Sequence, residues 1–441
     1  MKRNVYLLCI IAFIVNLGFG TIMPLLPFLL LYYEGELTDL PENLGTIPNV
    51  GELAIQITIL TSIFMLTRAF LARYFGNLSD HIGRKKIIFT GLLLYTILSY
   101  GYILSRSWID ILIVRGIQGA ASAMVWPVSE AMLTDSVHWS ERGKYMGYYM
   151  TTSNVSFFAG PLFGAYLYKF AAHVLGMNVF DALTFPFYVM TANALVGMII
   201  SIFTVETTTS FKSANWKFSI ITLILGENKE TIKIPKHISK SIKVLYVMGF
   251  ANGVAMGLVA PISMVFVIHY ITSDPAATGM LATLSSIVGF LANCPAGIIS
   301  DKIGRKKVVI VGQLGTRVAT LLLPFSKTYE ELLAIYSLRA AAFNIVSPAY
   351  RALQADLVPK KLRGKVFGTV QSLFNFGAAF APIGGAIYQI AMKWEFNILG
   401  YIVPGVAISF WISAFIGLIS LILFITLVYE PEKQEKEKLS I

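Results

Sequence analysis

"GNLSDHIGRKK" at residues 76–86 and "GIISDKIGRKK" at residues 297–307 are two copies of one pattern, separated by 221 positions. The same separation links turn residues and charges elsewhere in the chain, which chance similarity between apolar sequences would not produce. Examples are Pro127 and Pro348, Asp135 and Asp356, Gly147 and Gly368, and Pro161 and Pro382. We infer an internal duplication in which two halves of the chain share one architecture.

The composition is that of a membrane protein. Of the 441 residues, 56% are hydrophobic and only 13% are charged, and the mean hydropathy is +0.69. Apolar stretches long enough to cross a bilayer recur along the whole chain. The expected spans are 5–32, 52–75, 87–105, 109–134, 143–170, 184–204, 242–271, 277–296, 308–326, 331–356, 364–391 and 402–429. We therefore predict an all-α membrane protein of twelve transmembrane helices in two parallel, pseudo-twofold-related six-helix halves.

The charges are distributed unequally between alternate loops. The formal net charge is +11. If the N-terminus lies inside, the even-numbered loops hold clusters of Lys and Arg, whereas the first outer loop holds acidic residues and no Lys or Arg. This asymmetry follows the positive-inside rule and predicts that both termini are cytoplasmic. It argues against a nucleic-acid partner, which would require the basic residues on one soluble surface.

The chain divides into four predicted parts. These are an N-terminal six-helix half at 1–205, a cytoplasmic linker at 206–241, a C-terminal six-helix half at 242–430 and a cytoplasmic tail at 431–441. Within the linker, the apolar run Trp216–Leu225 is too short to span a bilayer, so we expect it to lie on the inner leaflet. The first apolar run is too long for a signal peptide and is expected to be retained. Cys9 and Cys294 fall within predicted spans and indicate no disulfide framework.

Each copy of the repeated pattern combines residues with distinct physical uses. Gly76 either allows two helices to approach closely or ends a helix, and Gly83 suits a turn that needs a positive φ. Arg84 follows Asp80 by four residues, a spacing at which the two can form a charge-assisted pair. The lysines that follow can interact with anionic lipid headgroups. The second copy repeats these residues as Gly297, Asp301, Gly304 and Arg305.

The pattern Gly-x-x-x-Asp-x-x-Gly-Arg-Lys, between the second and third spans and again between the eighth and ninth, resembles the signature loop of the major facilitator superfamily. The resemblance extends over essentially the whole chain. It implies the major facilitator fold and a cytoplasmic charge network that latches the two halves in an outward-open state. Carried over residue by residue, that network comprises Asp80, Arg84, Asp135 and Arg142 in the first half and Asp301, Arg305, Asp356 and Arg363 in the second.

Three further stretches resemble the twelve-helix drug/proton antiporter branch of this family. The motif residues are Gly18, Gly20, Pro24 and Pro27 in the first span, Arg115, Gln118 and Gly119 in the fourth, and Gly160, Pro161 and Gly164 in the fifth. The match in the fifth span is partial, with Ser156 and Ala165 where the branch usually has glycine. Small residues at four-residue spacing also permit close helix packing, so a purely structural interpretation stays open. The same spacing recurs at Gly377, Ala381 and Gly385, beside Pro382.

Charged residues inside the spans are candidates for a solute or proton pathway, because each is costly in a bilayer. In the family the first, fourth, seventh and tenth helices line a central cavity, which implicates Arg115 and Arg339; alternatively, Arg115 holds helices together. Glu130 and Arg351 occupy equivalent positions with opposite charge, and Glu130 either exchanges protons or belongs permanently to the charge network. Arg317 lies on a helix that is peripheral in the family, which predicts a structural or snorkelling role. Further candidates, each also explicable by helix packing, are Asn16, Gln118, Trp126, Asn154, Asn252 and Tyr350.

These observations favour a secondary active transporter over an enzyme. The first hypothesis is a proton-coupled efflux antiporter that works by alternating access. The alternative is an uptake symporter or uniporter for a small organic anion, because arginine outnumbers carboxylate in the expected cavity. The chain contains neither His-Glu-x-x-His nor Gly-x-Ser-x-Gly, and we expect no cofactor and no metal. The expected partners are a small-molecule substrate, protons and membrane lipids, and we expect a monomer in the plasma membrane.

Overall fold

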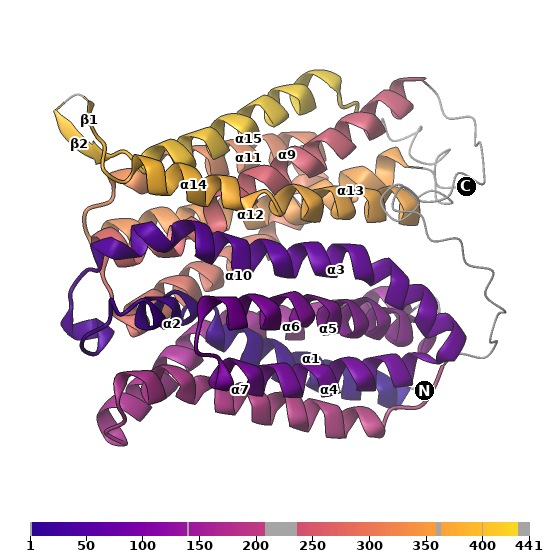
Figure 1. The fold of residues 1–441 in the computed structure, drawn as a ribbon. Helices are drawn as coiled ribbons and strands as arrows, with labels where there is room; N and C mark the ends of the chain where they lie inside the picture. Colours follow the sequence, from indigo (N-terminus) through magenta and orange to yellow (C-terminus); the bar gives the residue numbers. More distant parts are fainter. Residues whose placement is uncertain (1, 139–140, 208–235, 359–362, 399, 431–441) are drawn as a thin grey trace. The chain divides into compact units, whose positions relative to one another are not determined.

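The structure, a computed structural model, describes residues 2–138, 141–207, 236–358, 363–398 and 400–430 (Figure 1). The predicted inner-leaflet helix at Trp216–Leu225 and the tail at 431–441 lie outside these residues. The chain forms two compact units, which we call unit 1 (Met1–Lys217 with Met264–Thr283) and unit 2 (Phe218–Ser263 with Leu284–Ile441). The units follow spatial contacts, so the four-part division at residues 205, 241 and 430 stays a prediction.

The first half of the chain is built almost entirely of helices. They are α1 (Lys2–Ile22), α2 (Leu26–Tyr33), α3 (Ala54–Ile82), α4 (Arg84–Leu104), α5 (Trp108–Asp135), α6 (Arg142–Lys169) and α7 (Val179–Ile202). The first predicted span consists of two helices, since α1 ends before Pro24 and α2 has Pro27 in its first turn. A proline removes a backbone donor and clashes with the preceding turn, which explains the break.

The second half repeats this order. Its helices are α9 (Lys236–Phe266), α10 (Pro275–Ile303), α11 (Arg305–Leu322), α12 (Tyr329–Leu357), α13 (Arg363–Ala378), α14 (Ala381–Ala391) and α15 (Ala407–Leu427). The fifth helix of this set is interrupted at residues 379–380, just before Pro382, whereas α6 continues through Pro161. The duplicated prolines therefore have different consequences in the two halves.

The duplication extends to the starts of two corresponding helices, α5 in the first half and α12 in the second. Ser107 and Asp110 form a reciprocal capping box at the start of α5, and Thr328 and Glu331 form the same box at the start of α12. The two boxes are 221 positions apart, since 328 − 107 = 221. Each box satisfies two backbone donors that would otherwise be unpaired at a helix N-terminus.

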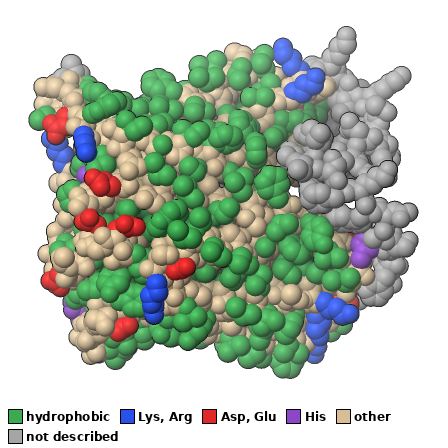
Figure 2. Space-filling view, in the orientation of Figure 1, with side chains coloured by type: hydrophobic (Ala, Val, Ile, Leu, Met, Phe, Trp, Pro, Cys, Tyr) green, Lys and Arg blue, Asp and Glu red, His purple; other side chains and the backbone are tan. Residues whose placement is uncertain are grey.

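Most long helices have the length and apolarity of membrane spans. Figure 2 shows hydrophobic side chains over most of the visible face, with charged side chains toward the helix ends. Within the described residues, eleven helices are long and apolar enough to cross a membrane. The fifth predicted span, α6, is not among them, because it contains the polar run Thr151–Asn154 and Ser156 together with Arg142 and Lys144.

One predicted boundary is wrong. We expect the last span to begin at residue 402, but β1 (Glu395–Ile398) and β2 (Tyr401–Pro404) form an antiparallel hairpin there, and α15 begins only at Ala407. Gly400, with φ of +86°, lies in the turn. The residues of β2 are apolar and partly β-branched, so hydropathy alone cannot separate them from the start of a helix.

Close helix packing occurs at several predicted glycines. In unit 1 a Cβ atom at Gly160 would lie 2.6 Å from the Cα of Gly20, and one at Gly164 would collide with the backbone of Thr21. These glycines therefore let α6 and α1 pack backbone to backbone. In unit 2, α14 makes a similar contact with α9 at Gly384, which adjoins the buried, predicted Gly385.

Candidate functional site

The junction between α3 and α4 carries the first copy of the repeated pattern. Gly83 separates the two helices with φ of +104°, as predicted. Directly after it, Arg84 forms ion pairs with Asp80, at 3.1 Å, and with Asp135 at the end of α5. The other hydrogen bond from Arg84 Nη1 goes to the carbonyl oxygen of Ala131 at 2.7 Å. One guanidinium thus joins the ends of α3, α4 and α5.

The junction between α10 and α11 repeats this arrangement in unit 2. Gly304 has φ of +102°, and Arg305 lies 3.4 Å from Asp301 and 2.6 Å from Asp356. Arg305 Nη1 also donates to the carbonyl oxygen of Ala352 at 2.8 Å. Ala352 follows Ala131 by 221 positions, so even the backbone acceptor is duplicated.

Two carboxylates missed by sequence reasoning complete these junctions. Glu206 accepts hydrogen bonds from the backbone N–H groups of Arg84, at 3.1 Å, and Lys85, at 3.0 Å. Glu430 accepts from the N–H of Arg305 at 2.7 Å. Glu206 follows α7 and caps the N-terminus of α4, and Glu430 follows α15 and caps the N-terminus of α11. Negative charge is favourable at a helix N-terminus. Their separation of 224 rather than 221 positions (430 − 206) hid them from the constant-offset comparison.

The lysine after each arginine also has a structural partner. Lys85 Nζ donates to the carbonyl oxygen of Ile202 at 2.6 Å, at the end of α7. Lys306 Nζ donates to the carbonyl oxygen of Val428 at 2.7 Å, directly after α15. Both lysines therefore bond to unpaired carbonyls at a helix C-terminus, a function that the sequence interpretation had left to lipid headgroups.

Four predicted residues of the two junctions remain: Arg142 and Arg363 of the charge network, and the glycines Gly76 and Gly297. Arg142 Nε donates to the carbonyl oxygen of Thr134 at 3.0 Å, next to Asp135. Arg363 is the first residue of α13, and its side chain lies outside the described part of the chain. Gly76 and Gly297 lie inside α3 and α10, so the alternative that they end a helix is wrong. No described atom lies within 4 Å of a Cβ placed at either glycine. Neither glycine therefore lies in close contact with another helix within the described residues.

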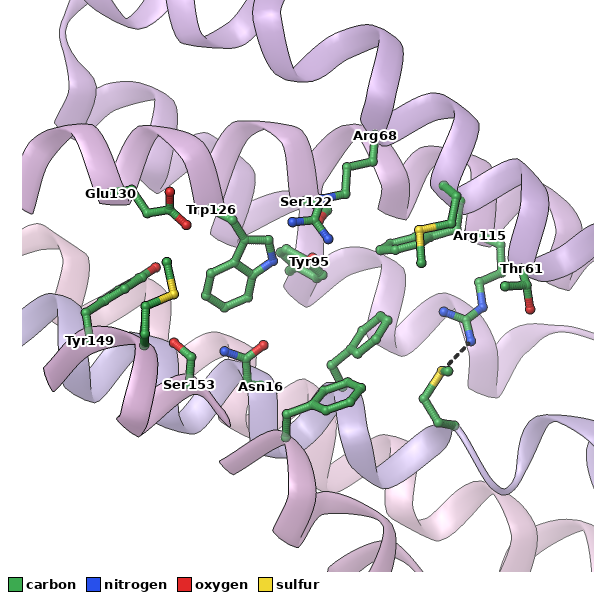
Figure 3. A pocket seen from close by; sticks show the side chains of 16 residues that line it. Asn16, Thr61, Arg68, Tyr95, Arg115, Ser122, Trp126, Glu130, Tyr149 and Ser153 are labelled. Carbon is green, nitrogen blue, oxygen red and sulfur yellow. Dashed lines mark hydrogen bonds between the residues drawn. The ribbon is translucent and has the colours of Figure 1, made fainter. Parts of the chain in front are cut away.

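Unit 1 contains a partly open pocket of about 300 Å³, which we call the cavity of unit 1, lined by residues of α1, α3, α4, α5 and α6 (Figure 3). Four predicted residues line it: Asn16, Arg115, Trp126 and Glu130. Figure 3 shows Glu130 and Tyr149 toward one end of the cavity and Arg115 toward the other. Gln118 and Asn154 are not among its lining residues. Tyr95 and Tyr149, which the sequence did not single out, also line it, and so does Arg68, a charged residue of the second predicted span.

Arg115 is held by its surroundings in unit 1. Its side chain is 3% exposed, and its guanidinium carbon lies 5.6 Å from the ring centre of Phe19 and 5.8 Å from that of Phe64. Nη1 donates to Gln118 Oε1 at 3.2 Å, and the same oxygen accepts from the Tyr102 hydroxyl at 2.8 Å. Gln118 therefore positions Arg115, and the aromatic faces stabilise the buried charge by cation–π interaction.

Unit 2 contains a second partly open pocket of about 300 Å³, the cavity of unit 2. The predicted candidates Asn252, Arg339, Tyr350 and Arg351 line it, and so does Arg317. The side chain of Arg317 is 7% exposed and donates to Asn252 and, at 2.8 Å, to Gln313. The snorkelling interpretation of Arg317 is therefore wrong, because its guanidinium points into the protein. Three arginines and no carboxylate line this cavity among the described residues.

The described residues contain no group of three or more His, Cys, Asp and Glu side chains that could hold a metal ion. The polar groups concentrated in the membrane-spanning part are instead single charges, amides and hydroxyls around the two cavities. Such an arrangement suits reversible binding of a small solute.

Comparisons with known proteins support this assessment. A family model, Major Facilitator Superfamily, matches residues 8–241 and 245–441. The chain is 23% identical over 420 residues to an uncharacterized MFS-type transporter of Methanocaldococcus jannaschii, with coverage of 92% of this chain and 97% of that protein. It is 25% identical over 421 residues to the multidrug resistance protein MdtG of Proteus mirabilis, covering 93% and 96%.

The fold also matches a solved transporter. The inward-open structure of the xylose transporter XylE from E. coli superposes with a TM-score of 0.65 at 14% identity, over 99% of each chain. The predicted fold of two six-helix halves is thereby confirmed. Since the family model covers nearly the whole sequence, the chain belongs to the Major Facilitator Superfamily and is a multi-pass membrane transporter rather than an enzyme.

Proposed function

We propose that this transporter exports small organic solutes by alternating access, as a proton-coupled antiporter. The observation that carries solute transport is a cavity with charged and aromatic lining in each unit, within helices that are otherwise strongly apolar. Charged groups in such helices are costly and are retained where they serve a pathway or a partner. The direction of transport is proposed from similarity to proteins named multidrug resistance proteins, which spans most of the chain.

Glu130 is the proposed proton carrier. It is the only carboxylate among the described residues that line the cavity of unit 1. Arg68 and Arg115 line the same cavity, so binding or release of a solute there would change the charged surroundings of Glu130. In proteoliposomes with an imposed pH gradient, Glu130→Gln should abolish the pH dependence of transport. Unchanged pH dependence would exclude Glu130 as the proton site.

The two junction clusters are the proposed latches of the outward-open state. Each is a network of an arginine, two aspartates and a helix-capping glutamate, and the two networks are nearly identical. Asp80→Asn should weaken the first network and shift the protein toward the inward-open state. Spin-label distances across the cytoplasmic face would report the shift, and distances equal to those of the wild type would oppose this function.

The proposed setting follows from the charge distribution. We propose that the protein lies in the plasma membrane as a monomer with both termini in the cytoplasm. The basic loop residues would then face anionic headgroups of the inner leaflet. Modification of single introduced cysteines by an impermeant thiol reagent in intact cells tests this orientation.

A second candidate function is uptake of a small organic anion by symport or uniport. The observation that favours it is the cavity of unit 2, with its three arginines and no carboxylate among the described lining residues. An imposed pH gradient separates the two candidates. An antiporter moves its solute against the direction of proton flow, a symporter moves it along that flow, and a uniporter does not respond to the gradient.

A further inference from the structure

We propose that Arg317 and Arg339 form a binding subsite for the oxyanion group of an organic solute, such as a carboxylate or phosphate. The subsite lies wholly within the cavity of unit 2. The inference rests on the proposed function, in that this cavity receives the transported solute, and it specifies the chemical class of that solute.

Arg317 has unused hydrogen-bonding capacity in a buried place. Its Nη2 group donates to both Asn252 Oδ1 and Gln313 Oε1. Its Nε–H has no hydrogen-bond partner within the described structure, although the side chain is 93% buried (100 − 7). An unpaired buried donor is costly, and more so on a charged group. The guanidinium is therefore held by two amides at Nη2, and one of its donors is left unpaired.

The fold makes room for this arginine. Arg317 passes over Gly417 of α15, and a Cβ atom at that position would collide with its Nε and Cζ atoms. The absence of a side chain at residue 417 thus determines where the guanidinium lies. Asn252 on α9 and Gln313 on α11 hold it from the other side. This is a built position rather than the accidental orientation of a flexible side chain.

Arg339 contributes a second cation with only neutral partners. Its Nε donates to the Thr320 hydroxyl at 3.2 Å, and its Nη2 lies 3.9 Å from the sulfur of Met256. Both arginines line the same cavity. With no carboxylate among the described residues that line the cavity, the protein supplies no counter-charge there. An anionic ligand would supply it.

The cavity of unit 1 contains a contrasting arrangement. There, Arg115 lies near aromatic faces and donates to Gln118, and the cavity has its own carboxylate in Glu130. The cavity of unit 2 has no carboxylate among the described residues that line it. An oxyanion in the cavity of unit 2 could accept from guanidinium N–H groups of Arg317 and Arg339, which line it together; such a paired donor geometry is one that arginine provides and lysine does not. The aromatic side chains Phe343 and Phe374 line the same cavity and suit an apolar body attached to the anion.

Equilibrium binding of two matched probes tests the subsite. The probes are 1-naphthoate and its neutral amide, 1-naphthamide, titrated calorimetrically into the purified full chain in detergent. Naphthoate should bind at least about tenfold more tightly, as expected for charge-assisted hydrogen bonds. Arg317→Gln should remove this preference while leaving naphthamide binding unchanged, and Arg317→Lys should restore only part of it.

Two further variants control for misfolding and for non-specific effects of charge. Gly417→Ala removes no charge but displaces the Arg317 side chain, and it should weaken naphthoate binding about tenfold or more. Lys393→Gln removes an exposed positive charge of unit 2 outside the cavity and should have no effect. Equal affinity of the wild type for the two probes, or a preference that survives both Arg317→Gln and Gly417→Ala, would overturn the proposal.

The same preparation separates this inference from the proposed function. If naphthoate binds through Arg317 but no solute crosses proteoliposome membranes, the subsite stands and the transport mechanism proposed above fails. If solutes are transported but the wild type shows no preference for naphthoate, the subsite fails and the transport mechanism stands.

Discussion

Gly83 and Gly304 occupy equivalent positions in the α3–α4 and α10–α11 junctions. Alanine substitution at each tests how much the capping carboxylate contributes to the stability of the junction. Both residues have nearly the same positive φ, +104° and +102°. Their surroundings differ. A Cβ atom at Gly83 would lie 2.6 Å from Glu206 Oε2, whereas at Gly304 the nearest atom, Glu430 Oε2, would be 3.5 Å away. Alanine therefore introduces the same backbone strain at both positions but displaces a capping carboxylate at only one.

The magnitudes follow from these two effects. Backbone strain at such a conformation costs about 1–3 kcal/mol, and both variants should lose that much stability. At residue 83 the displaced Glu206 would also lose its hydrogen bonds to two backbone N–H groups, and loss of a helix cap costs about 1–2 kcal/mol. We therefore expect Gly83→Ala to be destabilising by roughly 1–2 kcal/mol more than Gly304→Ala.

Denaturant titration of the purified protein in detergent, followed by circular dichroism, measures the difference. The double variant Gly83→Ala/Glu206→Ala adds a check. Since the cap is already displaced in Gly83→Ala, the second substitution should cost little further stability. Equal destabilisation by the two alanine variants, or full additivity in the double variant, would refute the reasoning.

Three other predictions concern the packing and the caps. Gly164→Ala should reduce the yield of folded protein strongly because α1 lies against α6 there, whereas Gly147→Ala, which meets no described atom within 4 Å, should be neutral in the same size-exclusion assay. Asp135→Asn removes one partly exposed partner of Arg84 and should cost only about 0.2–1 kcal/mol of stability in the denaturant titration. Glu430→Gln keeps an oxygen that can accept the bond but removes the negative charge at the start of α11, so it should lower stability by about 0.3–1 kcal/mol in the denaturant titration, with a smaller loss at high salt because salt screens this interaction.

The fold could be predicted largely from the sequence because its signals are local and repeated. Apolar length marks the spans, and the constant offset of 221 positions links charges and turn residues in both halves. The positive φ of Gly83 was predictable, since glycine between two helix signals tolerates it without steric cost. The pairing of Arg84 with Asp80 follows from helical spacing alone.

Other features depend on tertiary contacts that no local pattern indicates. The capping function of Glu206 depends on the end of α7 lying beside the start of α4. The inward orientation of Arg317 depends on the gap left by Gly417, a residue 100 positions away in the sequence (417 − 317). The last predicted span begins at residue 402, inside the second strand of the hairpin, because the residues of that strand are apolar like those of the helix that follows.

The central claim, proton-coupled export, is tested most directly by solute flux in proteoliposomes under an imposed pH gradient. A thermal-shift screen of drugs and organic anions first selects a solute that stabilises the purified protein. With the interior of the vesicles acidic, the account predicts that this solute accumulates inside as protons leave, and that Glu130→Gln abolishes the gradient-driven part. Flux that ignores the gradient, or accumulation only when the gradient is reversed, would contradict it.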